Sequence, residues 1–269
     1  MKTALTIAGS DSGAGAGIQA DLKTFAAFGV YGTSAITAVT AQNTSGIAAA
    51  APLSADLVTA QIEAIAGDIQ IDATKIGMLA TSAIVEAVAA AIRELELPLV
   101  VLDPVLVSSS GDRLLDIDGV QALCRELLPV ARVVTPNIPE AEAMSGRRIR
   151  SLEDARGAAR QLVHMGARAV IVKGGHAPET ADYGPLTEVV DLLVEERAVH
   201  EFRTPRVESR HAHGTGCAFA SAVAASLALG FALTDAARDA QAYVSGAIRH
   251  SLALGHGRAL LNHFWNRRG

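Results

Sequence analysis

The chain has 269 residues and a net charge of −5; half of the residues are hydrophobic and 4% are aromatic. This composition supplies a large aliphatic core, which excludes disorder, and the mild acidity without a run of like charges argues against a nucleic-acid-binding surface. No linker, internal repeat or shift in composition divides the chain, so we expect one domain over residues 1–269.

The sequence also indicates the cellular compartment of the protein. Cys124 and Cys217 are too few for a disulfide framework, and the short N-terminal apolar run does not resemble a signal peptide. We therefore expect a cytoplasmic protein. The uncharged stretch between His213 and Asp235 is long enough to span a membrane, but it begins with small residues and is rich in Ala and Ser, which favours a buried central helix.

Short apolar runs recur along the chain, each followed by a segment with helical periodicity. This alternation is typical of parallel strands joined by crossover helices and predicts an α/β fold. The predicted parallel strands are residues 4–8, 34–39, 73–76, 99–102, 133–135 and 169–172. Residues 189–194 and 199–202 are joined by a short turn and predict an antiparallel hairpin at one edge of the sheet.

Local signals mark the ends of several predicted helices. Ser151 and Asp154 form a capping-box pattern, and Asp118 with Gln121 forms a weaker one. Three glycines stand where helices are expected to end: Gly29, Gly166 and Gly230.

Polar residues and glycines follow each of the six predicted parallel strands. The carboxyl ends of parallel strands lie at one edge of a sheet, where ligands bind, so we expect these residues to surround one crevice. In chain order they are 9–11, 42–43, 77–78, 103–104, 135–137 and 173–175.

The first glycine-rich segment, residues 13–17, allows the backbone to approach a ligand closely or to form a flexible turn. It overlaps a match to the dinucleotide fingerprint G-x-G-x-x-A, but the second strand ends in Gln42 and Asn43 where that fingerprint needs an acidic residue. Asp21, in the following helix, either faces the crevice or lies on a solvated helix face.

The second glycine-rich segment, residues 213–217, precedes the uncharged helix. Successive N–H groups at such a helix start favour a phosphate or oxyanion site, and the alternative is a close-packed turn. No G-x-x-x-x-G-K-[ST] motif is present, which excludes a P-loop. We expect the helix end to lower the pKa of Cys217, so that the thiol accepts a proton or attacks carbon; the alternative is an inert buried thiol.

Hard oxygen donors predict a magnesium site. Asn137 and Glu140 lie three residues apart at a helix start, and with Asp103 they could hold a hydrated Mg²⁺; alternatively, Glu140 is an ordinary first-turn carboxylate. Lys173 could place a charge on a transferring phosphoryl group. His211 and His213 are spaced like metal ligands, but no further cluster completes a zinc site, so we expect no transition metal.

Seven of these segments together resemble the hydroxymethylpyrimidine and phosphomethylpyrimidine kinases of thiamine biosynthesis, members of the ribokinase-like superfamily. The resemblance runs in order from about residue 5 to the helix after Cys217. The segments are residues 8–24, 40–44, 75–78, 103–105, 135–141, 172–176 and 213–217.

The resemblance implies a three-layer α/β sandwich with a mostly parallel sheet, and an ATP- and Mg²⁺-dependent kinase. This kinase phosphorylates 4-amino-5-hydroxymethyl-2-methylpyrimidine and then its monophosphate, and it is commonly a homodimer. The implied pyrimidine pocket is Gly9, Asp21, Gln42 and Met78. The implied metal ligands are Asp103 and Glu140, and the implied ATP and phosphate ligands are Asn137, Lys173 and His213. The implied catalytic groups are Lys173, the N–H groups of Gly214, Thr215 and Gly216, and Cys217 as the base.

Three positions depart from the pattern of that family: Ala14, Ser109 and Ala212. The nearest alternative within the fold is a pyridoxal kinase, since pyridoxal also carries a hydroxymethyl group on a flat nitrogen ring. Two further alternatives are a dinucleotide-dependent oxidoreductase and a ligand sensor with a decayed kinase site.

Overall fold

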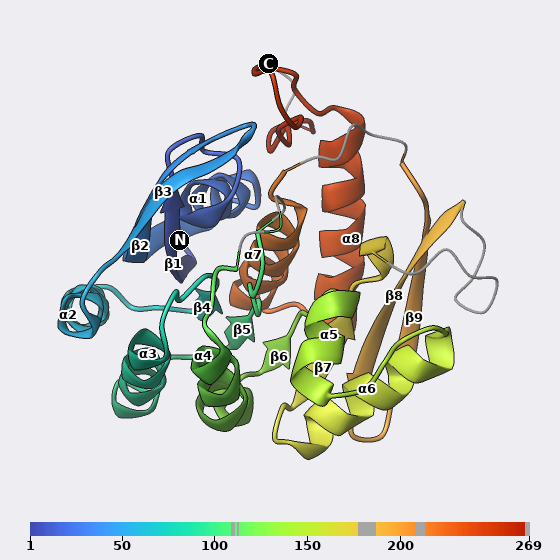
Figure 1. Ribbon diagram of the computed structural model, residues 1–269, viewed down its shortest axis with the longest axis horizontal. Coiled ribbons are helices and arrows are strands. Elements are labelled where there is room, and N and C mark those ends of the chain that lie inside the picture. The colour runs from blue at the N-terminus through green and yellow to red at the C-terminus, as the bar shows by residue number, and fades with distance from the viewer. Residues whose placement is uncertain (109–110, 112, 177–186, 208–212, 267–269) are drawn as a thin grey trace.

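A computed structural model describes residues 1–108, 111, 113–176, 187–207 and 213–266. Two of the three departures, Ser109 and Ala212, lie outside these residues. Within them, nine strands form one sheet in the order β3-β2-β1-β4-β5-β6-β7-β8-β9 (Figure 1). The strands are β1 (Thr3–Asp11), β2 (Tyr31–Asn43), β3 (Gly46–Pro52), β4 (Ala73–Ile76), β5 (Val100–Leu102), β6 (Val133–Val134), β7 (Ala169–Val172), β8 (Glu188–Glu195) and β9 (Val199–Pro205).

Neighbouring strands pair in parallel across the middle of the sheet, in the order β2, β1, β4, β5, β6 and β7, which confirms the predicted α/β fold. The predicted hairpin is also confirmed, because β8 pairs antiparallel with β7 and with β9. The antiparallel strand β3 on the opposite edge was not predicted. Its residues are largely exposed alanines, which have little intrinsic preference for strands, so the sequence carries no strand signal there.

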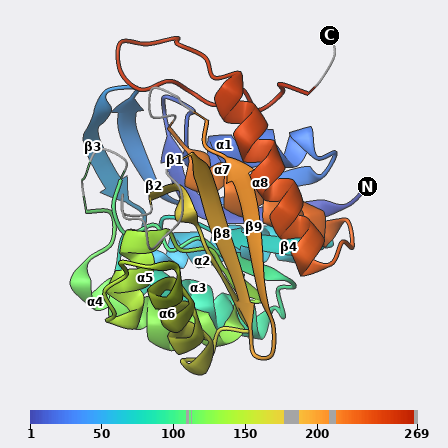
Figure 2. The same cartoon turned by 90° about the vertical axis from the view of Figure 1, so that its right-hand side faces the viewer.

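Helices cover both faces of the sheet, giving three layers (Figures 1 and 2). One buried core lies between the sheet and the helices α2 to α6, and a second lies between the sheet and α1, α7 and α8. The helices are α1 (Gly17–Ala27), α2 (Ala55–Ala66), α3 (Ser82–Glu94), α4 (Ile117–Ala122), α5 (Ile138–Ser145), α6 (Leu152–His164), α7 (Thr215–Ala228) and α8 (Leu233–Arg249).

Most predicted helix ends are confirmed. Ser151 caps α6 in a capping box with Asp154. The predicted cap at Asp118 is wrong, because α4 begins earlier and the Asp116 side chain accepts the Gly119 N–H at its start. The three glycines expected at helix ends all have positive φ: Gly29 (74°), Gly166 (122°) and Gly230 (91°).

Helix α7 is the predicted central helix. Every residue from Ala218 to Ala228 is buried, because α7 packs on β1, β4 and β5 and is flanked by α1 and α8. In the part of the chain that the structure describes, no helix combines the length and apolarity that crossing a membrane requires. The sheet and the flanking helices therefore fix the direction in which the N-terminus of α7 points.

Candidate active site

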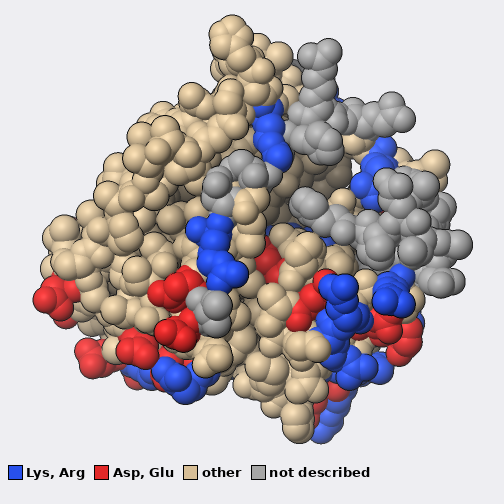
Figure 3. Space-filling view, viewed as in Figure 1, with Lys and Arg blue, Asp and Glu red and all other residues tan. Residues whose placement is uncertain are grey.

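One cavity of about 1120 Å³ lies along the carboxyl edge of the parallel strands. Its lining includes residues that follow β1, β2, β4, β5, β6 and β7, so the predicted convergence of strand ends on one crevice is confirmed. Figure 3 shows the corresponding face of the molecule hollowed near its centre, with Lys and Arg side chains on the rim. The volume exceeds what one small ligand needs, and it can hold two substrates at once.

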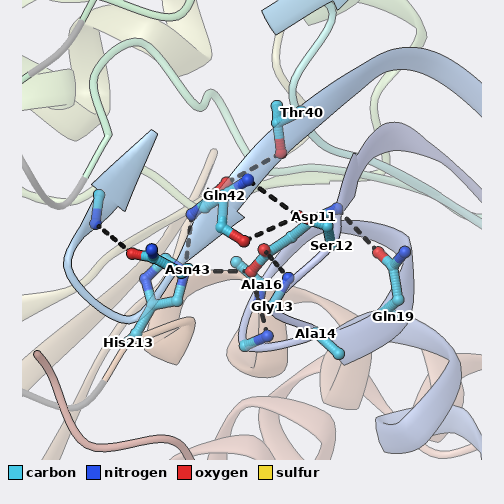
Figure 4. A network of polar contacts seen from close by, with 12 residues as sticks. Asp11, Ser12, Gly13, Ala14, Ala16, Gln19, Thr40, Gln42, Asn43 and His213 are labelled. Atoms are coloured by element: carbon cyan, nitrogen blue, oxygen red, sulfur yellow. Dashed lines mark hydrogen bonds and ion pairs between the residues drawn. The ribbon is translucent and has the colours of Figure 1, made fainter. Parts of the chain in front are cut away.

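Asp11, at the end of β1, organises the first glycine-rich segment. Its carboxylate accepts the N–H groups of Gly13, Gly15 and Ala16 at 2.8, 3.0 and 2.9 Å (Figure 4). Burial alone would raise the pKa of Asp11, but hydrogen bonds from His213 and from this backbone outweigh burial and hold the pKa below its usual value. The ionised Asp11 side chain therefore holds this glycine-rich segment in place at the cavity, a role that was not predicted from the sequence.

His213 and Gln42 meet at the same wall. The Nε2 atom of His213 lies 3.0 Å from Nε2 of Gln42 and 3.3 Å from Oδ2 of Asp11 (Figure 4). Gln42 also accepts a hydrogen bond from the hydroxyl of Thr40. The structure thus places His213 beside the predicted pyrimidine ligand Gln42.

Gly9 and Met78 complete the lining at the acceptor end of the cavity, by which we mean the end formed by the strand ends of β1, β2 and β4. A Cβ atom on Gly9 would lie 3.1 Å from Sδ of Met78, so the glycine leaves room for the methionine side chain. Two of the residues predicted for the pyrimidine pocket therefore lie next to each other in the cavity lining.

The turn before α7 faces the middle of the cavity. Gly214 has φ +84°, and a Cβ atom there would lie 1.9 Å from the carbonyl oxygen of Gly15. A Cβ atom on Gly216 would lie 3.3 Å from Nζ of Lys173 and 3.6 Å from Oδ2 of Asp103. With Thr215, which also lines the cavity, these small residues bring the N-terminus of α7 next to the buried charges.

Those charges are two carboxylates and one ammonium. Nζ of Lys173 donates to Oδ1 of Asp103 at 2.8 Å, and Glu140 lies beside them in the cavity lining. Burial, with a smaller contribution from Asp103, raises the pKa of Glu140 to about 7, although Lys173 acts against the shift. Burial would lower the pKa of Lys173, but Asp103 and Glu140 raise it, so the lysine stays charged.

Glu140 and Asn137 also hold each other in place. They form a capping box at the start of α5, in which the Asn137 N–H donates to Glu140 at 2.8 Å and the Glu140 N–H donates to Asn137 at 2.9 Å. Two buried carboxylates face a single lysine here, so an added cation would be attracted. Asp103 and Glu140, with the amide of Asn137 nearby, therefore fit a hydrated Mg²⁺.

The pKa expected for Cys217 was wrong. Burial raises the pKa of the thiol to about 11, with further increases from Asp21 and Asp103, and these effects outweigh Lys75 and a hydrogen bond with the Gly17 backbone. The position at the start of a helix favours the thiolate, but desolvation is the larger effect. Cys217 lines the cavity as a protonated thiol at neutral pH.

Asp21 lies behind the cavity lining and is fully buried. Its carboxylate accepts from Nζ of Lys75 at 2.9 Å and from the hydroxyls of Thr6 and Ser221 at 2.7 Å each. Lys75, which the sequence analysis left without a role, lies at the cavity floor instead. Its only sequence signal is a lysine within the otherwise uncharged strand β4.

The opposite end of the cavity was not predicted. Asp191 of β8 accepts the Gly174 N–H at 2.7 Å and the Gln241 amide at 2.8 Å, and burial raises the pKa of this carboxyl group. The cavity lining also includes apolar side chains from β8, α5 and α8: Val189, Pro139, Ala143, Val244 and Ile248. We call this the nucleotide end, because a mainly apolar slot with a few polar groups suits a flat base.

Replacing Glu140 with Gln is expected to stabilise the protein at alkaline pH. The folded protein raises the pKa of Glu140 from 4.5 to about 7, so ionisation weakens the fold as pH rises through this window and costs nothing below it. Gln keeps the capping oxygen without the charge. Urea titrations should show the variant more stable by about 3 kcal/mol at pH 8 and equal near pH 4.5. A pH-independent difference would contradict this account.

A three-layer α/β fold whose cavity joins a helix N-terminus, a buried lysine, two carboxylates and a set of apolar side chains defines a small-molecule kinase of the ribokinase-like class. The family model described as "Phosphomethylpyrimidine kinase" matches residues 11–262. The chain belongs to the phosphomethylpyrimidine kinase family, which decides against a dinucleotide-dependent oxidoreductase.

Individual relatives agree with this family. The chain is 47% identical over 264 residues to the hydroxymethylpyrimidine/phosphomethylpyrimidine kinase of Rhizobium meliloti, covering 97% of this chain and 96% of that protein. It is similar to the solved phosphomethylpyrimidine kinase of Clostridium difficile, with TM-score 0.81, 38% identity and coverage of 92% and 100%. The pyridoxal kinase of Staphylococcus aureus in complex with ADP gives TM-score 0.90, 34% identity and coverage of 100% and 95%.

Proposed function

We propose that this protein transfers the γ-phosphoryl group of ATP to 4-amino-5-hydroxymethyl-2-methylpyrimidine, and then to the resulting monophosphate. One observation carries the proposal: the N-terminus of α7 lies against Lys173 and Asp103 inside a cavity that also contains Gln42 and Met78. Groups that can bind a phosphoryl group and the proposed pyrimidine pocket therefore share one cavity. The names of the relatives, which include a hydroxymethylpyrimidine and a phosphomethylpyrimidine, support the choice of acceptor.

The acceptor is oriented at the end of the cavity near β1, β2 and β4. The Gln42 side chain offers both a donor and an acceptor, which suits the edge of an aminopyrimidine. The Asp21 carboxylate accepts hydrogen bonds from Thr6, Lys75 and Ser221, so we assign it an indirect role of holding Lys75.

We call the place where the phosphoryl group passes from ATP to the acceptor the transfer point. Lys173 and the N–H groups of Gly214, Thr215 and Gly216 stabilise negative charge there. Both suit the negative charge of a transferring phosphoryl group. A Mg²⁺ ion would be held by Asp103 and Glu140, and it would neutralise part of the charge of the phosphates. Because the Cys217 thiol is protonated at neutral pH, we assign most of the acceleration to positioning and electrostatics and keep Cys217 as a candidate base of small effect.

The proposal is tested directly by product analysis. The protein is incubated with Mg-ATP and a panel of hydroxymethyl heterocycles, and the products are identified by mass. We expect the pyrimidine monophosphate first and the diphosphate later. A lack of any phosphorylated product would overturn the proposal in favour of a ligand sensor with a decayed site.

Pyridoxal kinase activity is the second candidate function. A solved pyridoxal kinase from Staphylococcus aureus in complex with pyridoxal superposes over 100% of this chain, with TM-score 0.89 and 34% identity. The two candidates are separated by kcat/KM for the pyrimidine and for pyridoxal, measured with the same enzyme. A ratio that favours pyridoxal would reverse the choice of substrate.

Replacing Gln42 with Ala is expected to raise the KM for the pyrimidine about ten-fold, with a smaller change in kcat, because the variant loses hydrogen bonds made in both the bound and transition states. Gln61 of α2 offers a matched control. Its side-chain amide forms hydrogen bonds with the backbone of Ile36, away from the cavity. An unchanged KM in Gln42→Ala, or an equal rise in Gln61→Ala, would remove Gln42 from the pocket.

We also propose that the protein is a cytoplasmic homodimer acting through one domain. The free edge of β3 and the exposed side chains of Tyr31 and Val39 on β2 offer a surface for a second copy. Analytical ultracentrifugation tests the oligomeric state, and a purely monomeric species at micromolar concentration would contradict it.

A further inference from the structure

The segment after α8 forms part of the wall at the acceptor end of the cavity. This segment, residues 251–261, is called the strap here. Its two ends pair through reciprocal backbone hydrogen bonds between Leu252 and Leu260, at 2.8 and 2.9 Å. The Ala259 carbonyl accepts the N–H of His213 at 2.9 Å. The strap is thus tied directly to the turn that begins α7.

Close packing fixes the strap against the end of β2. The Arg258 N–H donates to the carbonyl of Thr44 at 2.9 Å, and the Gly257 N–H donates to the Thr44 hydroxyl at 3.1 Å. A Cβ atom on Gly257 would lie 2.1 Å from the Thr44 carbonyl oxygen. On the other side of the strap, Leu260 packs against Gly15. A Cβ atom on Gly15 would lie 2.7 Å from Cδ2 of Leu260. The backbone of Arg258 is therefore held in a defined position.

The side chain of Arg258 lines the cavity. Within the described ranges 1–108, 111, 113–176, 187–207 and 213–266, its guanidinium has no ion-pair or hydrogen-bond partner. The two lysines of the lining differ in this respect, because Lys75 is paired with Asp21 and Lys173 with Asp103. Arg258 therefore brings to the acceptor end a positive charge that none of the described residues neutralises.

The two acceptors of the proposed function differ mainly in charge. The alcohol is neutral, whereas a phosphate monoester carries a charge of about −1.5 to −2 at neutral pH. Since the lysines already neutralise buried carboxylates, the second acceptor needs a further cation. Arg258 follows Gly257 in the strap and precedes Ala259, whose carbonyl accepts the N–H of His213, so the backbone that carries the guanidinium is held next to the anion-binding turn.

We propose that Arg258 binds the phosphate group of the monophosphate acceptor and thereby selects for the second phosphorylation. This inference rests on the proposed function. A planar guanidinium binds a phosphate through two parallel hydrogen bonds, and it contributes little to a neutral alcohol. The strap thus adds to the pyrimidine pocket a group that only the charged acceptor uses.

The test compares both acceptors in Arg258→Gln. We expect KM for the monophosphate to rise about 10- to 100-fold, as for the loss of a charge-assisted hydrogen bond, while KM for the alcohol and for ATP changes less than two-fold. Arg258→Lys should give an intermediate KM for the monophosphate. Arg249, exposed at the end of α8, is the matched control, and Arg249→Gln should leave both acceptors unaffected.

Three results would overturn the inference. The first is an equal loss for both acceptors in Arg258→Gln, and the second is no loss for either. The third is a selective loss in Arg113→Gln, because Arg113 also lines the cavity and would then be the phosphate ligand. Failure of the proposed function is distinguishable, since the wild-type protein would then phosphorylate neither acceptor.

Discussion

Replacing Lys173 with Met is expected to lower kcat/KM for the alcohol about 100- to 1000-fold. The lysine ammonium lies against the first turn of α7 and donates to Asp103, so it stands among the groups that face the transferring phosphoryl. Met keeps the length of the side chain and removes the charge. Steady-state kinetics at saturating ATP measure the effect, and a value within ten-fold of wild type would remove Lys173 from the transfer point.

Stability must be measured in the same variant, because the change also leaves Asp103 buried without its partner. Breaking a buried pair in this way typically lowers the free energy of unfolding by about 3 to 5 kcal/mol. The double variant Lys173→Met/Asp103→Asn removes both charges and should recover most of that loss. Kinetics are therefore run well below the Tm of each variant. A single variant as stable as wild type would show that the pair is not buried in solution.

Local sequence signals predicted several of the polar groups that line the cavity. Asp103, Asn137 and Lys173 each follow a short apolar strand, and parallel strands place their carboxyl ends together whatever the lengths of the connecting segments. The glycines at 214 and 216 precede a long uncharged helix, a pattern that sets the direction of the backbone N–H groups. These features depend on residues that are neighbours in the chain, so they could be predicted from the sequence.

Features that depend on distant residues were missed. Asp21 meets Lys75, which is 54 residues away, and nothing local distinguishes this buried pair from a solvated helix face. The error at Cys217 has the same origin: the helix start is visible in the sequence, but the burial that raises the pKa is produced by the folded protein. The strap contacts β2 more than 200 residues earlier in the chain, and its sequence carries no motif.

The second large effect is expected from Gly214→Ala. Its φ of +84° disfavours any side chain by about 1–2 kcal/mol, and the new Cβ atom would lie 1.9 Å from the carbonyl oxygen of Gly15. The turn must then move, and its N–H groups no longer point at the phosphoryl group. Losing one such donor typically costs 100- to 1000-fold in kcat. We therefore expect a fall in kcat of about this size, measured at saturating concentrations of both substrates.

Gly230 provides the matched control because it stands at the other end of the same helix. Its φ of +91° imposes a similar backbone strain, but apart from its chain neighbours no atom of the described residues lies within 4 Å of a Cβ atom on Gly230. Gly230→Ala should therefore lose about as much stability from backbone strain, yet keep its kcat. Equal losses of kcat in the two variants would mean that strain in α7, rather than the direction of the N–H groups at the cavity, limits the reaction. A fall confined to Gly214→Ala would instead place the anion-binding turn at the transferring phosphoryl group.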